Sequence, residues 1–290
     1  MKGIVLAGGK GSRLYPITMG ASKQLLPVYD CPMIYYPLSV LLRAGIAEIL
    51  IISSPEHLPG FQNLLGDGAD FGVSFSYAEQ LAPKGIAESL IIAEAFLNGD
   101  ACTLILGDNL FYGDGVENGL QKAIKGEGAS IFSYPVKDPQ RYGVIGYDMD
   151  YNPRSIIEKP QKPASNRAVT GLYVYPNSAI KIAKGLKPSA RGEIEITDIN
   201  QHLLEMGHLS VIDLSKSDSW FDTGTIDSLY EATDYVRALE SRVGVKVGCM
   251  EEAAFISGFM SVDQVAARAE KLSNTSYGDY LNQIVQLHGG

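Results

Sequence analysis

A regular alternation of short apolar runs and helical patterns in the first half of the chain constrains the fold most. The apolar runs lie at residues 4–7, 48–53, 73–77 and 102–106. Short runs of this kind are typical of strands that are buried on both faces. Helical spacing of apolar residues separates them at 34–44, 57–65 and 86–97. This alternation predicts an α/β fold with a doubly wound, mostly parallel, Rossmann-like sheet covered by helices on both faces.

The pattern changes in the second half of the chain. Strand-like runs at 131–136, 143–147, 154–158 and 169–175 follow one another with short connections and few helices. They predict an inserted β region with mixed or antiparallel pairing, which forms the other wall of a cleft. Helical patterns return at 194–206, 226–242, 261–271 and 277–287. We therefore expect a core at 1–242, with halves at about 1–130 and 131–242, and a small C-terminal helical tail at 243–290.

Length, charge and cysteine content narrow the class of protein. A chain of 290 residues can form one large α/β domain with a small appendage. The net charge of −9 argues against general binding to nucleic acid or to an anionic membrane. No stretch approaches the roughly 20 apolar residues that cross a bilayer, and the first apolar run is too short for a signal peptide. The three cysteines are far apart and the four histidines lack metal-ligand spacing, so we expect free thiols in a cytoplasmic protein.

The loop after the first predicted strand carries the most information about chemistry. It reads Leu6-Ala7-Gly8-Gly9-Lys10-Gly11-Ser12-Arg13. Glycines let backbone N–H groups approach phosphate oxygens, and ligands of open α/β sheets bind at the carboxyl ends of strands. The guanidinium of Arg13 can hold a phosphate through two hydrogen bonds. The glycines alone fit a tight turn equally well, and it is Arg13 together with Lys23 that favours phosphate binding.

The loop differs from two better-known phosphate-binding motifs. It lacks the third glycine of the dinucleotide-binding G-x-G-x-x-G pattern, which argues against a dehydrogenase. It also lacks the P-loop pattern, because Gly11 follows Lys10 where a serine or threonine is required.

Residues 6–18 and the run Lys-Gln-Leu-Leu-Pro-Val-Tyr-Asp at 23–30 resemble the sugar-nucleotide pyrophosphorylases. The resemblance is closest to the long-form glucose-1-phosphate thymidylyltransferases and extends over roughly the whole chain. It implies Mg²⁺-dependent transfer of a thymidylyl group from dTTP to glucose 1-phosphate by direct in-line attack. The products are dTDP-glucose and pyrophosphate, in the first step of dTDP-sugar synthesis of the dTDP-rhamnose type. It also implies a homo-oligomer, expected to be a tetramer, with the helical tail at an interface between subunits.

The resemblance also implies roles for individual residues. The catalytic residues it implies are Arg13, Lys23, Asp108, Lys159 and Asp222. Mg²⁺ is expected on Asp108 and Asp222. The nucleotide-binding residues it implies are Leu6, Ala7, Gly8, Gly9, Gly11, Ser12, Arg13, Gln24, Gln80, Pro83, Gly85 and Asp108. The sugar-phosphate-binding residues it implies are Lys23, Asn109, Tyr142, Gly143, Glu158, Lys159, Val169 and Trp220, and Ile86 and Thr197 are further candidates for the pocket wall.

Several of these residues have ordinary explanations when each is taken alone. Asp108 follows an apolar run, where it is placed either to hold Mg²⁺ or to cap the next helix. Asp222 alone fits a turn, and Glu158 with Lys159 fits a surface ion pair. The alternating charges at 191–198 are typical of a solvated face. The family resemblance, and not the spacing, pairs Asp108 with Asp222.

Two alternative functions stay open. The side-chain amide of Gln80 complements the O4 and N3 edge of thymine and uracil equally, so a uridylyltransferase or a dual dTTP/UTP enzyme is the first. The second is a nonenzymatic regulatory module that binds nucleotide. The presence of all five predicted catalytic residues argues against the second alternative, because a binding module has no need of metal carboxylates.

The chain also departs from the family pattern. Ser12 replaces a usual threonine, and Cys31 replaces a common lysine. Asp114, Lys216 and Ile256 stand where histidine, arginine and arginine are common. In long-form members these three positions contribute to a second nucleotide site between subunits, where the end product inhibits. Because lysine and isoleucine cannot reproduce bidentate phosphate binding, we expect weaker or altered inhibition by dTDP-rhamnose and an intact active site.

Overall fold

The central element of the structure is one mixed β-sheet, with the main strand order β10-β9-β11-β6-β1-β4-β5. The structure is a computed structural model and describes residues 1–289. The four strands that the first half contributes to this sheet are parallel to one another, as predicted. They are β1 (Lys2–Leu6), β4 (Glu48–Ser53), β5 (Ser74–Glu79) and β6 (Cys102–Leu106), and the short strands β2 (Pro27–Val28) and β3 (Cys31–Pro32) pair with each other outside it.

The second half extends the same sheet with mainly antiparallel strands. These are β8 (Ala129–Pro135), β9 (Gly143–Tyr147), β10 (Pro153–Glu158) and β11 (Arg167–Tyr175). β11 pairs antiparallel with β6, β8 and β9, so it joins the two halves. The sequence analysis does not predict β12 (Leu209–Asp213), which lies parallel to β8. The mixed pairing expected for the second half is confirmed.

Helices cover both faces of the sheet, which explains why its central strands are apolar along their whole length. Successive side chains of a strand point to opposite faces. Accordingly, Val5 and Ile51 belong to one buried cluster, and Ile4 and Leu50 to another. The first cluster is covered by α1 (Tyr35–Arg43), α2 (Leu58–Leu65) and α5 (Asp114–Lys125). The second is covered by α3 (Glu88–Ile92), α4 (Glu94–Leu97), α6 (Ser178–Gly185) and α7 (Ile196–Glu205).

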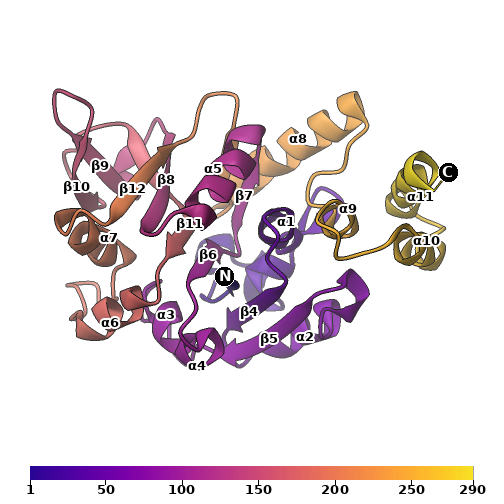
Figure 1. Cartoon of the computed structure of the whole chain (residues 1–290), viewed down its shortest axis with the longest axis horizontal. Helices are drawn as coiled ribbons and strands as arrows, with labels where there is room; N and C mark the ends of the chain where they lie inside the picture. Colours follow the sequence, from indigo (N-terminus) through magenta and orange to yellow (C-terminus); the bar gives the residue numbers. More distant parts are fainter. Residues whose placement is uncertain (290) are drawn as a thin grey trace.

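The remaining helices follow one another at the C-terminal end of the chain. They are α8 (Ile226–Val243), α9 (Met250–Ile256), α10 (Val262–Lys271) and α11 (Ser276–His288). Figure 1 shows α10 and α11 at one edge of the molecule and the β9–β10 hairpin at the opposite edge. Among the helices formed by residues 1–289, none combines the length and apolar character that a bilayer crossing requires.

Local capping explains why α8 and α10 begin where the sequence predicts. Thr225 and Ser228 exchange backbone and side-chain hydrogen bonds in a capping box before α8. Ser261 and Gln264 do the same before α10. At its other end α8 stops at Gly244, whose φ of 77° lies in the left-handed region that favours glycine.

Several elements differ from the sequence prediction. The helix expected over 86–97 is divided into α3 and α4, and α5, α6 and α9 were not predicted. α5 contains glycine, which weakens an isolated helix. The reason for Gly119 lies in packing, because a Cβ at this position would come within 3.0 Å of both Phe132 and Ile212. Tertiary contact therefore favours a residue that local propensity disfavours.

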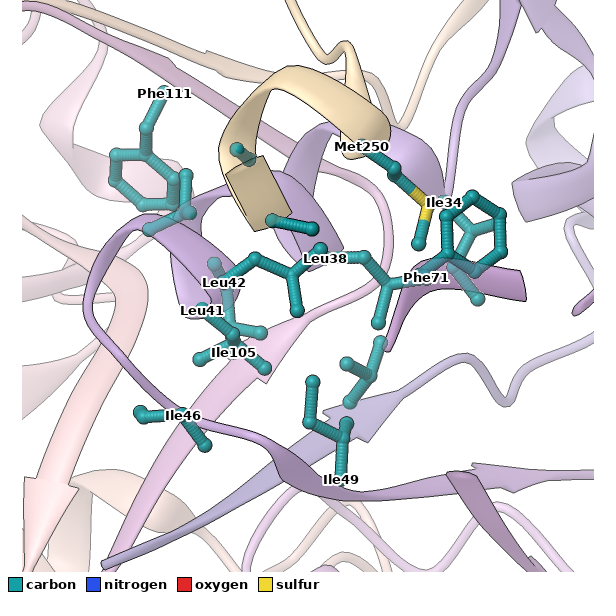
Figure 2. Close-up of a cluster of buried hydrophobic side chains, with 14 of the residues drawn as sticks. Ile34, Leu38, Leu41, Leu42, Ile46, Ile49, Phe71, Ile105, Phe111 and Met250 are labelled. Atoms are coloured by element: carbon teal, nitrogen blue, oxygen red, sulfur yellow. The ribbon is translucent and has the colours of Figure 1, made fainter. Parts of the chain in front are cut away.

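The C-terminal helices are anchored to the first half of the same chain. Figure 2 shows Met250 of α9 in the buried cluster with Ile34, Leu38 and Phe71. The Ser257 hydroxyl donates to the Leu42 carbonyl at 2.7 Å, just beyond the end of α9. These contacts dock the tail on α1.

A buried ion pair holds α10 to α9. The side chain of Glu251 is 1% exposed, and its carboxylate lies 2.9 Å from the Arg268 guanidinium. Arg268 also contacts Asp70 at 2.9 Å and lies over the ring of Phe71. Glu251 thus depends on Arg268 for compensation of a charge that water does not reach.

We expect Arg268→Ala to lower the free energy of unfolding by about 3 kcal/mol, because it leaves the buried Glu251 charge unpaired. Urea denaturation followed by Trp220 fluorescence measures this loss. Lys271→Ala is the matched control on the same helix, since its side chain is 63% exposed. The control should change stability by less than about 0.5 kcal/mol. Equal losses in the two variants would contradict the role given to the Glu251–Arg268 pair.

Candidate active site

A cavity of about 210 Å³ opens where the two halves of the sheet meet. Asp108 and Asn109 reach it from the carboxyl end of β6, which is where ligands of open α/β sheets bind. The second half supplies the opposite wall. Of the residues predicted from the sequence, the cavity brings together Arg13, Ile86, Asp108, Asn109, Tyr142, Gly143, Glu158, Lys159, Val169, Thr197, Trp220 and Asp222.

A small two-stranded ribbon places the two predicted metal carboxylates side by side. β7 (Asn109–Tyr112) pairs antiparallel with β13 (Ser219–Asp222), and Asp222 is the partner of Asn109 in this register. Thr223 stabilises the end of the ribbon, because its hydroxyl donates a hydrogen bond to the Asp108 carbonyl at 2.7 Å. The segment after Asp108 is therefore a strand, and the alternative that Asp108 caps a helix is wrong.

Lys23 neutralises one of the two carboxylates. It is 7% exposed and forms an ion pair with Asp108 Oδ2. Burial by itself would raise the pKa of Asp108, but the Lys23 charge and the hydrogen bonds from Lys23 and Asn109 hold that pKa below its usual value. Burial and then the Asp108 carboxylate raise the pKa of Asp222, against the attraction of Lys23 and Arg13. Of these two carboxylates, Asp108 has a direct ion pair with Lys23, whereas Asp222 is influenced by basic side chains that lie further away.

The two aspartates fit a magnesium site. Burial and the neighbouring Asp108 charge raise the pKa of Asp222. A cation bound by both carboxylates would offset this repulsion. Within residues 1–289, no group of three or more histidine, cysteine, aspartate or glutamate side chains could hold a metal. A site of one or two carboxylates suits Mg²⁺, which keeps several waters and takes further ligands from substrate phosphates.

Asn109 is a positioning residue in the structure. Its Nδ2 donates to Asp108 Oδ1 at 2.9 Å. Its Oδ1 accepts from the Trp220 indole N–H at 2.6 Å and from the Gly171 N–H at 3.1 Å. These bonds orient its amide toward β11, β13 and Asp108, while Asn109 also lines the cavity, and its expected contact with the sugar phosphate stays a prediction. Trp220 in turn packs edge-on against Tyr142, with ring centres 5.2 Å apart.

The residues expected to bind the sugar phosphate form a second polar group in the same cavity. Glu158 accepts a hydrogen bond from the Thr197 hydroxyl at 2.6 Å and another from Arg191 at 3.2 Å. Lys159 lies 3.7 Å from Glu158 and has a φ of 44°, a backbone conformation that is costly for a lysine. Such strain is concentrated at functional sites. A plain surface ion pair does not account for these contacts.

Arg191 lines the cavity, although the alternating charges around it are typical of a solvated face. Its side chain is 38% exposed and joins Glu158 to Glu195, at 3.2 and 2.7 Å. The charge pattern alone does not distinguish it from a surface arginine, because Glu158 lies on a distant strand, β10.

The glycine-rich loop leads from β1 to Arg13. Leu6 and Ala7 lie at the carboxyl end of β1, and Ser12 opens a single 3₁₀ turn. Gly9 and Gly11 have φ values of 99° and 58°, which other residues rarely adopt. Arg13 is exposed, and within the described chain it forms no ion pair, so its guanidinium is available for an anion.

A second cavity of about 590 Å³ lies on the other side of this loop. Its lining includes Gly9, Gln80 and Pro83, together with the exposed side chains of Met19 and Leu81. The other predicted nucleotide residues lie close by. Gln24 Nε2 donates to the Gly8 carbonyl at 3.4 Å, and Gly85 packs against the carbonyl of Ile194.

Ser12 lies in the glycine-rich loop, and the other positions that depart from the family pattern are not among the residues that line these two cavities. Asp114 lines a third cavity with Arg43 and Lys246, whereas Lys216 and Ile256 are exposed. Cys31 is a buried free thiol, and burial raises its pKa. The expectation of altered feedback inhibition stays a prediction.

Comparison with known proteins gives a uniform result. The nucleotidyl transferase family model matches residues 2–238. The glucose-1-phosphate thymidylyltransferase of Neisseria gonorrhoeae is 53% identical over 287 residues, covering 98% of this chain and 99% of its own. That of Mycolicibacterium smegmatis is 51% identical over 285 residues, with coverages of 98% and 99%.

Solved structures have the same fold. A Bacillus anthracis protein, provisionally assigned as a glucose-1-phosphate thymidylyltransferase and crystallised with sucrose, superimposes with a TM-score of 0.76. It is 44% identical, and the match covers 82% of this chain and 95% of that one. A UDP-glucose pyrophosphorylase complexed with UDP-glucose has a TM-score of 0.73 at 24% identity over 82% and 98% of the two chains, which shows the fold alone.

The raised pKa of Asp222 predicts a pH-dependent stability difference in protein freed of divalent cations. The folded state holds this proton more tightly than the unfolded chain, whose aspartates titrate near about 3.9. The free energy of unfolding is therefore not reduced by Asp222 below about pH 4. It falls as the pH rises above that value, until the pH has passed the pKa of Asp222 in the folded state. Asp222→Asn removes this cost.

We expect Asp222→Asn to be more stable than the parent protein at pH 7, by about 1.4 kcal/mol for each unit of pKa elevation. The difference should shrink toward zero near about pH 4. Urea denaturation in the presence of a chelator measures both values. Asp234→Asn is the control, because that side chain is 70% exposed. A less stable Asp222→Asn protein at pH 7 would show that burial and carboxylate repulsion do not govern how Asp222 affects stability.

Proposed function

The chain belongs to the nucleotidyl transferase family, and we propose that it couples dTTP with glucose 1-phosphate to give dTDP-glucose and pyrophosphate. The observation that carries the chemistry is the pairing of Asp108 and Asp222 beside Lys23 in one cavity with Arg13. The choice of substrates is supported by identities of about 50% over nearly the whole chain to proteins named for this reaction.

In this proposal the reaction is a single in-line displacement. A phosphate oxygen of glucose 1-phosphate bonds to the α-phosphorus of dTTP. The bond between that phosphorus and the bridging oxygen breaks, and its electron pair leaves with pyrophosphate. The nucleophile is already charged, so the protein has little acid–base work, and positioning with charge stabilisation supplies the rate.

Basic side chains place the phosphates. Arg13, at the end of the glycine-rich loop, binds the β- and γ-phosphates and stabilises the leaving group. Lys23 and Lys159 hold the attacking phosphate from the two halves of the sheet. Asp108 and Asp222 hold Mg²⁺, which supplies charge neutralisation on the triphosphate when it is bound. The ion pair between Lys23 and Asp108 orients both side chains before substrate arrives.

The sugar is bound by the second half of the core. Glu158 accepts hydrogen bonds from sugar hydroxyls, while Thr197 and Arg191 fix the direction of its carboxylate. The backbone at Gly143 allows close approach, because a Cβ there would lie 3.1 Å from Thr197 and 3.4 Å from Glu158. Tyr142, Val169 and Trp220 complete the wall.

The proposed function also implies a division of the chain, an oligomeric state and a cellular compartment. We assign residues 1–130 to the nucleotide half, 131–242 to the sugar half, and 243–290 to a tail that contacts other copies in a homotetramer. The exposed apolar side chains of Ile256 and Leu287 support such a contact. Three buried free thiols support a reducing cytoplasm, and the product would enter dTDP-sugar synthesis of the dTDP-rhamnose type.

The first test is pyrophosphate release with Mg²⁺ and glucose 1-phosphate, run in parallel with dTTP, UTP, CTP, ATP and GTP. We expect the highest kcat/KM with dTTP, and loss of turnover when EDTA removes the metal. Comparable rates with dTTP and UTP would favour the dual-specificity alternative. No turnover with any nucleotide or sugar phosphate, in a protein that still binds dTTP, would favour the nonenzymatic module.

Arg13→Ala tests the assignment of the leaving-group contact. Loss of one preorganised donor to developing charge costs about 3 kcal/mol or more, so we expect kcat to fall on the order of 10²-fold or more. Steady-state kinetics with dTTP measures this change. Arg154→Ala is the control, because its side chain is 70% exposed and pairs with Asp148. Near-normal kcat in Arg13→Ala would exclude the proposed role.

A further inference from the structure

The side chain of Gln80 is held from one side by two hydrogen-bond acceptors. Gln80 follows β5 and is 5% exposed. Its Nε2 donates to Glu88 Oε2 at 2.8 Å and to the Gly85 carbonyl at 3.4 Å. Glu88 is half-buried and opens α3, so the interaction joins the end of one strand to the start of the next helix.

These two acceptors determine the orientation of the Gln80 amide. An ionised carboxylate and a backbone carbonyl can only accept hydrogen bonds. The NH₂ group of Gln80 must therefore face Glu88 and Gly85, and its carbonyl oxygen must point the other way. That oxygen lies 2.6 Å from the position that a Cβ on Gly8 would occupy. Gly8 is thus required for the oxygen to lie over the loop, at the cavity that Gln80 lines with Gly9 and Pro83.

We propose that Glu88 is a positioning residue that sets which class of base the enzyme accepts. By fixing the Gln80 amide, it presents a hydrogen-bond acceptor, and no donor, to the base. Thymine and uracil carry an N–H at N3 and satisfy this acceptor. Cytosine has a lone pair at N3, as adenine has at N1, and either lone pair would face the Gln80 oxygen. Since a buried polar group left without a partner is costly, the arrangement rejects these bases.

This inference rests on the proposed function and deepens it. It predicts rejection of CTP and dCTP through one fixed amide. The Gln80 amide by itself does not discriminate dTTP from UTP, whose N3 edges are the same, so a preference for dTTP over UTP must come from other contacts. A purely structural role for Glu88 has a different consequence. An acidic residue in the first turn of a helix is favourable for the helix, and removing it for that reason would change stability without changing the preference among bases.

Glu88→Gln separates the two roles. The new amide can donate as well as accept, so both orientations of the Gln80 amide become hydrogen-bonded. The quantity to measure is kcat/KM for dTTP divided by kcat/KM for dCTP, with glucose 1-phosphate. We expect this ratio to fall roughly tenfold or more, because the pocket then offers a donor to cytosine N3. Glu94→Gln is the matched control, since Glu94 lies in the first turn of the next helix, α4, and pairs with Lys184.

Two further variants make the test decisive. In a Gln80→Leu background, Glu88→Gln should leave the dTTP/dCTP ratio unchanged within about twofold, because the amide through which Glu88 acts is gone. Glu88→Asp retracts the carboxylate by one methylene and keeps the charge, so it should lower the ratio even if Glu88→Gln proves unstable. An unchanged ratio in Glu88→Gln and Glu88→Asp, with normal turnover of dTTP, would overturn the inference.

Failure of the proposed function can be distinguished from failure of the inference about Glu88. If the parent protein fails to turn over dTTP, the proposed function is wrong, and the role of Glu88 is then decided by calorimetric affinities for dTDP and dCDP. Preferential binding of dTDP that weakens roughly tenfold relative to dCDP in Glu88→Gln would support the inference. Equal loss of affinity for both nucleotides would refute it.

Discussion

The active-site geometry depends on the hydrogen bonds of one buried amide. Asn109 accepts from Trp220 on β13 and from Gly171 on β11, and it donates to Asp108. Trp220 and Gly171 come from parts of the chain distant from Asn109, so these two bonds fix the position of the β7–β13 ribbon against the central sheet. The ribbon in turn decides that Asp222 stands beside Asp108. A buried amide with satisfied partners is directional, and apolar packing alone would not set this register.

The two halves of the molecule are joined both through the sheet and through loops. β11 lies antiparallel to β6, so the wall of the cavity from the second half adjoins the carboxyl edge of the parallel strands of the first half. A second junction lies near Gly85, where the Ile194 N–H donates to the Lys84 carbonyl at 2.7 Å. A Cβ on Gly85 would come within 2.3 Å of the Ile194 carbonyl, so glycine permits this close contact. The two walls of the site are therefore connected by the sheet and by this loop contact.

The charges in the cavity are arranged at a cost in stability. Asp222 is a carboxylate near a second carboxylate, and burial disfavours its charged form. Lys159 has a left-handed backbone conformation. The well-packed clusters on both faces of the sheet offset such costs, because each fully buried aliphatic side chain contributes about 1.5–3 kcal/mol. The combination is typical of a site that is organised before its ligands bind.

The sequence by itself determined the parallel sheet of the first half, the change to antiparallel pairing in the second, and the glycine-rich loop ending at Arg13. These follow from the period of apolar residues and from glycine's backbone freedom, which are local properties. It did not determine α5, α6, β7 or β13, nor the place of Arg191. The proximity of Asp108 to Asp222, the hydrogen bonds of Asn109 and the orientation of Gln80 were decided only by the tertiary structure. The first two depend on contacts between segments that are distant in sequence, which no local pattern records. The partners of Gln80 are close in sequence, but the path of the chain between β5 and α3 decides that Gly85 and Glu88 both accept from its amide.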